Sequence, residues 1–203
     1  MATRLERKKM GAALRQQVPR RSHGAWAPPP DRPNPLALLQ AQDEGRLQHL
    51  VPIKYGRMVE SPFAFLRGSA VVMAADLAAT PSTGLQVQLC GDAHLSNFGV
   101  FATPERQLVF DINDFDETHP GPWEWDLKRL VASAVVAGRA NGFGDKTNRK
   151  MAQTTAHTCA RVMDSLSKAL ADFALAYANQ TEQDHQALAD AIDSGQIAAQ
   201  REA

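Results

Sequence analysis

The sequence predicts an α+β fold that is mostly helical, with a small β-hairpin or sheet packed on helices. Three observations lead to this prediction. Apolar residues recur at helical spacing both before residue 78 and after residue 123. Between these stretches, residues 85–112 hold short runs in which apolar and polar side chains alternate, as they do in strands. The chain has 203 residues, 44% of them hydrophobic, so one sizeable core is expected.

Two helical stretches are expected before the strands. The first runs over residues 36–50, with its apolar residues in a loose stripe, and is broken at Pro52. The second starts with Ser61 as the N-cap and Pro62 as the first helical residue, and its apolar content continues to residue 77. Gly68, inside it, indicates either close packing or a break.

Three strands are expected in the middle of the chain. Residues 85–89 (LQVQL) alternate as a half-buried strand does. Residues 98–102 and 108–112 read as a hairpin joined by the turn TPER. We expect residues 114–122 (DFDETHPGP) to form a loop, because the stretch is too acidic and too rich in Pro and Gly for a regular element.

The last part of the sequence is predicted to be helical. Residues 123–140 have an apolar face at helical spacing, and NGFGD then ends the helix. A long Ala-rich helix is expected over residues 146–179, and another from about residue 182 to the end.

The first 34 residues form a basic, Pro-rich arm. Residues 1–33 hold eight Lys or Arg against two acidic residues, and the arm ends in WAPPPDRPNP, where proline blocks helix and sheet. We expect a solvated, disordered tail; contact with phosphate or anionic lipid is the alternative. Residues 35–203 are then expected to form a single domain.

Composition limits the possible functions. There are 22 basic and 22 acidic residues, which makes nucleic acid an unlikely partner. No apolar run follows the N-terminal charges as in a secretory signal, and no run is long enough to span a membrane. Cys90 and Cys159 are far apart and form no CxxC, which indicates a reducing, cytoplasmic environment.

A concentration of carboxylates suggests a metal site. The acidic residues are Asp92, Asp111, Asp114, Asp116 and Glu117. If the strand before Asp92 neighbours the 108–112 strand, both clusters emerge at one end of the sheet. Carboxylates held together repel each other unless a cation lies between them. Oxygen ligands suit Mg²⁺, which takes one or two carboxylates and completes its shell with water and phosphate oxygens.

The stretch LCGDAHLSNFG (89–99) gives this site a reaction class. Asp92 and Asn97 have the D-x-x-x-x-N spacing of the kinase catalytic loop, in which the Asp accepts a hydroxyl proton and the Asn holds metal. In kinases a second Asp, after a short hairpin, bridges Mg²⁺ to the phosphates. Here a predicted hairpin and an acidic loop follow in the same order.

These motifs resemble a bacterial family, domain of unknown function 2252 (DUF2252). The resemblance rests on RMVESPFAFLRGSA (57–70), GDAHLSNFG, VFDINDFDE and GPWEWDLKRLVASAVVAGR, and it covers roughly residues 50–139. The family in turn resembles the aminoglycoside-phosphotransferase branch of the protein-kinase-like fold. That resemblance implies that residues 35–203 are the C-lobe-like part of such a fold, and that the protein is a phosphotransferase using ATP and Mg²⁺ on an unknown hydroxyl acceptor, either a small molecule or a protein.

The resemblance also implies roles for individual residues. Asp92 is the catalytic base or orienting residue, and His94 is the loop histidine, which mainly orients the loop. Asn97 and Asp114 are metal ligands, and Asp126 braces the catalytic loop by accepting backbone N–H bonds.

Two details of the motif depart from that pattern. Counting back from Asp126 favours Asp114 as the metal ligand, whereas counting forward from Asn97 favours Asp111, and Asp116 is a third possibility. Cys90 stands where the aminoglycoside-phosphotransferase pattern has a His, which puts the usual loop-packing contact in doubt.

Parts of a phosphotransferase are missing from these 203 residues. There is no G-x-G-x-x-G and no G-x-x-x-x-G-K-[ST] to hold phosphates. We therefore expect the chain to be incomplete at its C-terminus, and the resulting exposed apolar face makes homo-oligomers an expectation. An inactive nucleotide- or metal-binding relic and a metal-dependent hydrolase using His94 are the alternatives. For Arg67 and Lys54 we expect pairs with internal carboxylates rather than phosphate binding.

Overall fold

The fold of the protein is taken from a computed structural model that describes residues 3–24, 26–159 and 194. Two compact units are distinguished, Met1–Ala156 and His157–Ala203, and the helices and strands named here belong to the first. The expected boundary near residue 34 falls inside it. The elements in chain order are α1 (Arg4–Gln17), η1 (Arg20–Gly24), α2 (Pro35–Asp43), η2 (Gln48–Leu50), α3 (Val51–Met58), α4 (Pro62–Gly68), α5 (Ala70–Ala78), β1 (Gln86–Leu89), η3 (Leu95–Asn97), β2 (Phe98–Ala102), β3 (Leu108–Ile112), β4 (His119–Pro122) and α6 (Glu124–Ala140).

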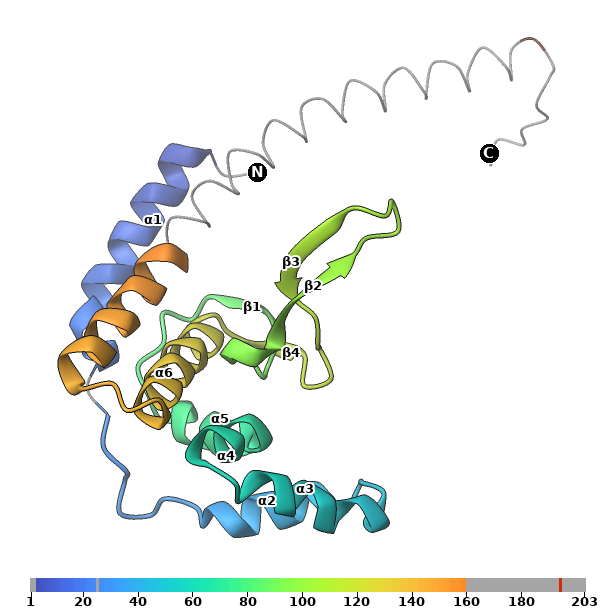
Figure 1. Ribbon diagram of the computed structural model, residues 1–203. Helices are drawn as coiled ribbons and strands as arrows, with labels where there is room; N and C mark the ends of the chain where they lie inside the picture. Colours follow the sequence, from blue (N-terminus) through green and yellow to red (C-terminus); the bar gives the residue numbers. More distant parts are fainter. Residues whose placement is uncertain (1–2, 25, 160–193, 195–203) are drawn as a thin grey trace, which may run out of the picture. The chain divides into compact units, whose positions relative to one another are not determined.

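The predicted class, α+β and mostly helical with small sheets, is confirmed (Figure 1). α4 and α5 both contact α6, and α2 and α3 pack against α5 and α4 respectively. A small core forms where α2, α3 and α5 meet, around Leu39, Met58 and Val72. In the described part of the chain, no helix is both long and apolar enough to cross a membrane.

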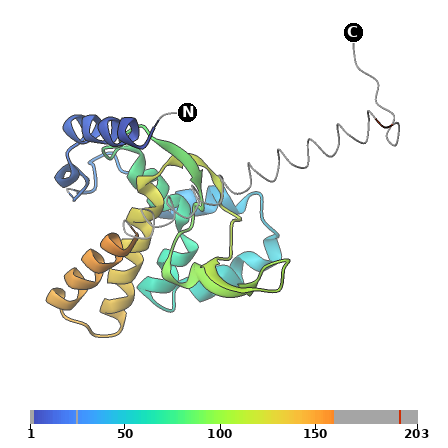
Figure 2. The ribbon, with the colours of Figure 1, turned by 90° about the horizontal axis from the view of Figure 1, so that it is seen from above.

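The strands form two separate antiparallel pairs. β2 pairs with β3 in the register Val100↔Phe110, so the predicted hairpin is confirmed with its predicted ends. β1 pairs with β4, with Val87 opposite Gly121. Figure 1 shows the β2–β3 hairpin extending away from the helices, and Figures 1 and 2 show β1 and β4 beside α6.

The expectation of a disordered arm is wrong for residues 4–17, which form α1. Thr3 and Glu6 make a capping box, in which each side chain accepts from the other residue's backbone N–H. Helix-favouring residues follow this start. The prolines that argued against a helix come only after the helix has ended.

The expected helices before the strands are shorter than predicted. The helix over 36–50 ends at Asp43, and Pro52, which we expected to break it, lies in the first turn of α3, where its missing N–H costs nothing. Ser61 caps α4 as predicted, because its hydroxyl accepts from Ala64 N at 3.0 Å. α4 then ends at Gly68, where a Cβ would lie 2.6 Å from the Met58 side chain. Both roles expected of Gly68 are therefore present.

Two predictions about the strands are corrected. Residues 119–122 were expected in a loop but form β4, and β1 pairs with this strand rather than with residues 108–112. Proline is tolerated here because both strands are sheet edges. The helix predicted over 123–140 is confirmed as α6, which begins at Glu124, and residues 145–159 are helical where a helix was expected from 146. The rest of that helix and the one after residue 182 lie outside the described residues.

Candidate functional site

The loop after β1 is held in place by one polar stripe of α6. Asp126 accepts backbone N–H bonds from Cys90 at 2.7 Å and from Gly91 at 3.1 Å. One turn later Arg129 binds Asp92, and Ser133 Oγ accepts from Leu95 N at 3.1 Å. Residues at i, i+3 and i+7 share a helix face, so a single face of α6 fixes residues 90–95. The Asp126 contacts are of the kind implied for a residue that braces this loop.

The loop approaches its surroundings too closely for any residue but glycine at position 91. Gly91 has φ +84°, a region that favours glycine, and a Cβ there would lie 2.0 Å from the Glu117 carbonyl oxygen. The loop that carries Asp92 and the acidic segment that ends at Glu117 are therefore in direct backbone contact.

Asp92 is an ionised carboxylate with a partner on each oxygen. Arg129 Nε donates to Oδ1 at 2.6 Å, and His94 Nε2 lies 3.4 Å from Oδ2. Burial raises the pKa of Asp92, but the interactions with His94 and Arg129 lower it more, so the net pKa lies below its ordinary value of 3.8. Arg129 is only 3% exposed, and it also donates to Leu66 O at 2.7 Å. The ion pair therefore fixes both the charge and the orientation of Asp92.

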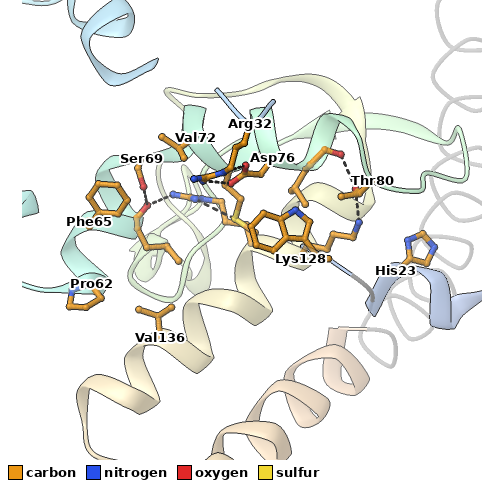
Figure 3. Close-up of a pocket in the computed structure, with 15 residues that line it drawn as sticks. His23, Arg32, Pro62, Phe65, Ser69, Val72, Asp76, Thr80, Lys128 and Val136 are labelled. Atoms are coloured by element: carbon orange, nitrogen blue, oxygen red, sulfur yellow. Dashed lines mark hydrogen bonds and ion pairs between the residues drawn. The ribbon is translucent and has the colours of Figure 1, made fainter. Parts of the chain in front are cut away.

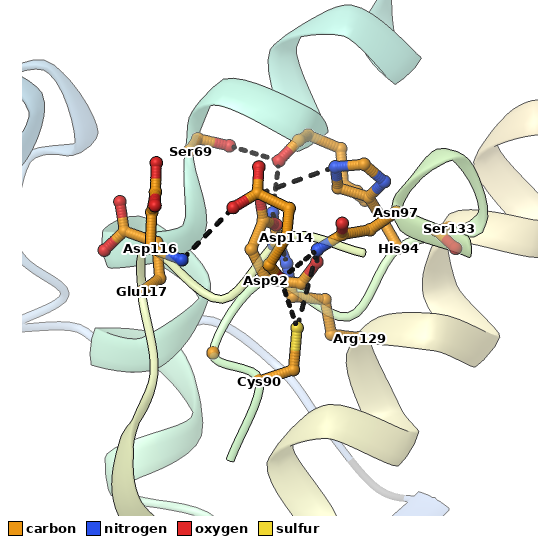
Figure 4. Close-up of polar contacts among 12 residues, drawn as sticks. Ser69, Cys90, Asp92, His94, Asn97, Asp114, Asp116, Glu117, Arg129 and Ser133 are labelled. Carbon is orange, nitrogen blue, oxygen red and sulfur yellow. Dashed lines mark hydrogen bonds and ion pairs between the residues drawn. The ribbon is translucent and has the colours of Figure 1, made fainter. Parts of the chain in front are cut away.

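Asn97 connects the two acidic segments. Its Nδ2 donates to the carbonyl oxygens of Asp92 at 3.0 Å and Asp114 at 3.1 Å. Its Oδ1 accepts no hydrogen bond from another residue in the described ranges, and the residue is 4% exposed. Figure 4 shows Asp92, Asn97 and Asp114 together at the centre of the site, with Asp116 to one side. The two acidic segments were expected to meet at the end of one sheet. They are instead brought together by the Asn97 side chain, which donates to the backbone of both.

Cys90, which precedes Gly91 in the loop, is buried and contacts both acidic segments. Burial raises the pKa of its thiol above the ordinary value of 9.0, so the thiol stays protonated and donates to Asp114 O at 3.4 Å. Its sulfur also accepts from Asn97 Nδ2 at 3.4 Å. Cys90 therefore packs between Asn97 and the backbone of Asp114.

A pocket of about 210 Å³ is lined by Asp92 and Asp114, while Asn97 is not among the residues that line it. Four carboxylate and three basic side chains line it, and the charged lining residues are Asp92, Asp114, Asp116, Glu117, Arg46, Lys54 and Arg67. A pocket that presents both carboxylates and basic side chains suits a ligand that joins a metal ion to phosphate groups. The carboxylates would then face the metal ion, and the basic side chains would face the phosphates.

The predicted metal ligands are not equivalent in the structure. Asp114 and Asp116 are exposed at the pocket, and Asp114 Oδ1 accepts from Asp116 N at 3.1 Å. Asp111 lies on β3, is not among the described pocket residues, and binds its neighbour's backbone, with Ile112 N 2.8 Å from Oδ1. His94 is 5% exposed and contacts Asp92, with its ring edge-on to Phe63 at 6.4 Å. Its position suits an orienting role.

The basic residues of the pocket differ in how they are paired. Lys54 Nζ lies 2.7 Å from Asp43 Oδ1, as expected of a residue that pairs with a carboxylate. Arg46 reaches Glu117 at 3.4 Å. The same expectation is wrong for Arg67, which makes no hydrogen bond or ion pair with any residue that the structure describes, although it lines an acidic pocket. Its guanidinium is the most available cation in the pocket.

The donor set fits a Mg²⁺ ion only if other oxygens complete the coordination shell. Within the described residues, no three His, Cys, Asp or Glu side chains are arranged to hold a metal ion by themselves. Asp92 and Asp114 nevertheless line one pocket, and Mg²⁺ usually takes one or two carboxylates together with water and phosphate.

Sequence reasoning missed Arg129 as a site residue. It is buried in α6 and reaches Asp92 across the fold, so no local pattern shows the contact. The available signal was the polar stripe of Asp126, Arg129 and Ser133 on an otherwise apolar helix. Three polar residues on one helical face indicate a polar partner segment.

The comparisons with known proteins agree with the family suggested by the motifs. The profile of the family described as uncharacterized protein conserved in bacteria (DUF2252) matches residues 46–168, which is more than half of the chain and includes the loop, the hairpin and α6. No curated protein and no solved structure matches the chain. The protein is therefore a member of the DUF2252 family.

Proposed function

We propose that the protein is a phosphotransferase-like protein that uses ATP and Mg²⁺ and acts on a hydroxyl acceptor. One observation carries the proposal: Asp92 and Asp114, from separate segments, line a single pocket that also presents Arg46, Lys54 and Arg67. Phosphoryl transfer depends on positioning and on stabilising charge, which a pocket with both signs of charge supplies.

Within this proposal Asp92 orients the acceptor hydroxyl. The pKa of Asp92 lies below its ordinary value, so at neutral pH the carboxylate does not readily take up a proton. Because both of its oxygens have partners, it can accept a hydrogen bond from the acceptor hydroxyl in a fixed orientation. Asp114, with Asn97 Oδ1 or Asp116, would hold Mg²⁺. A bound Mg²⁺ supplies charge neutralisation for the phosphate oxygens. Arg67 faces the same space and would contact phosphate.

The proposal is tested by calorimetric titration of ATP into the protein with and without Mg²⁺. We expect binding that depends on Mg²⁺ and that falls at least roughly tenfold in Asp114→Ala, because a charged contact of this kind contributes about 1.5–3 kcal/mol. Asp111→Ala is the matched control, since Asp111 is an exposed Asp nearby that is not among the described pocket residues. Equal heats for wild type and Asp114→Ala would contradict metal-bridged nucleotide at this pocket.

Assays of the wild-type protein also distinguish the two alternatives, an inactive relic and a metal-dependent hydrolase. Binding of Mg²⁺ and ATP without transfer to any hydroxyl would favour the inactive relic. Turnover with a metal and without nucleotide would favour the hydrolase, for which the contact between His94 and Asp92 is the supporting feature.

A further inference from the structure

A second cavity, larger than the charged pocket, is lined by Arg129. Its volume is about 460 Å³, within the range of small-molecule sites. α4, α5 and α6 supply most of its walls, and His23, Trp26 and Arg32 come from the N-terminal segment. The apolar side chains that line it are Trp26, Pro62, Phe65, Leu66, Val72, Met73, Leu77 and Val136.

The polar groups of this cavity are satisfied within the protein, with one main exception. Arg32 and Asp76 form a bidentate pair, with distances of 2.6 and 2.7 Å. Arg129 is occupied by Asp92 and Leu66 O. Lys128, by contrast, is half-buried and has no carboxylate within ion-pair distance in the described part of the chain. Its Nζ donates only to Thr80 Oγ1, at 2.8 Å.

The sequence would place a carboxylate beside Lys128, but the fold uses that carboxylate elsewhere. Glu124 stands four residues earlier on α6, the spacing at which Glu and Lys usually pair. Its carboxylate instead accepts from Thr83 N at 2.8 Å and from Thr83 Oγ1 at 2.7 Å. Lys128 is therefore a partly desolvated ammonium group with unused donors, and burial lowers its pKa more than the nearby Glu124 carboxylate raises it.

The two unused polar groups lie at one end of the cavity, away from Phe65 and Val136, with the paired Arg32 and Asp76 between the two ends. Figure 3 shows Lys128, Thr80 and His23 at one end and Pro62, Phe65 and Val136 at the other. His23 Nδ1 is buried and has no hydrogen-bond partner among the described residues, so it is a second unused polar atom in a residue that lines the cavity. An occupant that matches this arrangement has an anionic head and an apolar body.

We propose that this cavity is a binding site for a small amphipathic carboxylate, whose carboxylate pairs with Lys128 and whose apolar part lies against Phe65 and Val136. The ligand class follows from charge and shape. Thr80 Oγ1 already donates to Leu77 O at 2.8 Å and so meets Lys128 as an acceptor, which leaves the ammonium donors for a carboxylate. The site is distinct from the charged pocket and does not depend on the function proposed for it.

The test is isothermal titration calorimetry of the whole chain with octanoate, 1-octanol and octylammonium, which share an apolar tail and differ in the head group. We expect octanoate to bind at least roughly tenfold more tightly than octanol, the size of effect that a charged hydrogen bond gives, and octylammonium to bind most weakly. Lys128→Met keeps the methylene groups and should reduce octanoate affinity to that of octanol. Lys128→Arg should keep most of it, and Lys146→Met, at an exposed lysine outside the cavity, should change nothing.

Two results would overturn the proposal: equal affinities for octanoate and octanol in the wild-type protein, or no binding of either. Both comparisons use the wild type, so they decide the question even if Lys128→Met does not fold. Trp26 gives a second readout, because it lines the cavity and is 52% exposed. Octanoate should shift the tryptophan emission to shorter wavelength, and Trp26→Phe should remove that shift.

Discussion

Arg129 Nε lies 2.6 Å from Asp92 Oδ1, and this pair connects α6 to the loop that carries the candidate catalytic residue. The arginine is almost fully buried, while the aspartate side chain keeps 21% of its surface exposed at the pocket. A buried cation beneath a partly exposed anion holds the anion in one orientation and leaves its outer edge for a ligand. The position of the loop that carries Asp92 is therefore fixed by a buried side chain of α6.

Replacing Arg129 should destabilise the fold strongly. Arg129→Met leaves Asp92 partly buried without its partner, and breaking a buried pair in this way costs about 3 kcal/mol or more. Urea unfolding measures the loss. In a double-mutant cycle, Asp92→Asn with Arg129→Met should cost less than the sum of the two single changes. Additive effects would show that the pair is not coupled.

Asp126 should contribute to stability through the loop alone. Asp126→Asn keeps one oxygen acceptor but loses the charge that binds the N–H groups of Cys90 and Gly91. Hydrogen bonds to charged groups contribute about 1.5–3 kcal/mol, so a loss of about 2 kcal/mol is expected. Hydrogen exchange of those two amides should accelerate more than exchange in the β2–β3 hairpin. Asp31→Asn, at an exposed turn, is the matched control and should stay within about 0.5 kcal/mol of wild type.

The sequence predicted those parts of the fold whose signals are local. Ser61 with Pro62 predicted the start of α4, and alternation around TPER predicted both strands of the hairpin. The signals failed where tertiary contacts decide. Pro120 and Pro122 argued against a strand, yet β4 forms because its edge pairing with β1 tolerates them.

The sequence predicted which residues belong to the candidate site, but not the contacts that hold them together. D-x4-N spacing and the acidic segment identified Asp92, Asn97 and Asp114, and the structure brings these three together. The contacts that do so involve Arg129 and Cys90, and they join segments far apart in the sequence. Tertiary packing determines these contacts, so the spacing of residues along the sequence does not reveal them.

Substitutions at Gly91 and Gly142 should show how tightly the loop after β1 packs against the backbone of Glu117. Both have positive φ, +84° and +75°, but a Cβ at Gly142 meets nothing within 4 Å, whereas one at Gly91 lies 2.0 Å from Glu117 O. Gly142→Ala should therefore cost only the backbone strain, about 1 kcal/mol. Gly91→Ala should cost about 3 kcal/mol or more, because the acidic segment must also move. Similar unfolding midpoints for the two variants would mean that the contact is easily relaxed.

Arg67 should act on phosphate binding and not on stability, because it has no partner in the described part of the chain. Under the proposed function, Arg67→Gln should weaken binding of ATP with Mg²⁺ roughly tenfold, as the loss of one charged contact does. Arg57→Gln changes an exposed arginine of α3 outside the described lining of the pocket, and it should leave the affinity unchanged. Unfolding curves of both variants should match the wild type. A loss of affinity in both variants alike would point to general charge rather than to the pocket.

Stability should fall in acid because Glu124 must be ionised to hold the segment before β1. Burial raises the pKa of Glu124, but its bonds from Thr83 N and Oγ1 lower it more, so the net pKa lies below the ordinary value of 4.5. A pKa that is lower in the folded than in the unfolded state stabilises the fold fully above about the unfolded value. This stabilisation is lost as the pH falls through the folded pKa. Urea midpoints should therefore be flat from pH 7 to about 5 and decline below that.

Glu124→Gln isolates this contribution. The variant should be less stable than wild type at pH 7, because a neutral amide oxygen accepts more weakly from Thr83. The difference should shrink as the pH falls below about 4, since wild-type Glu124 then becomes neutral as well. Glu60→Gln, at an exposed position after α3, should follow the wild-type curve throughout. A gap between Glu124→Gln and wild type that stays constant down to pH 3 would mean that the side chain acts through packing and not through its charge.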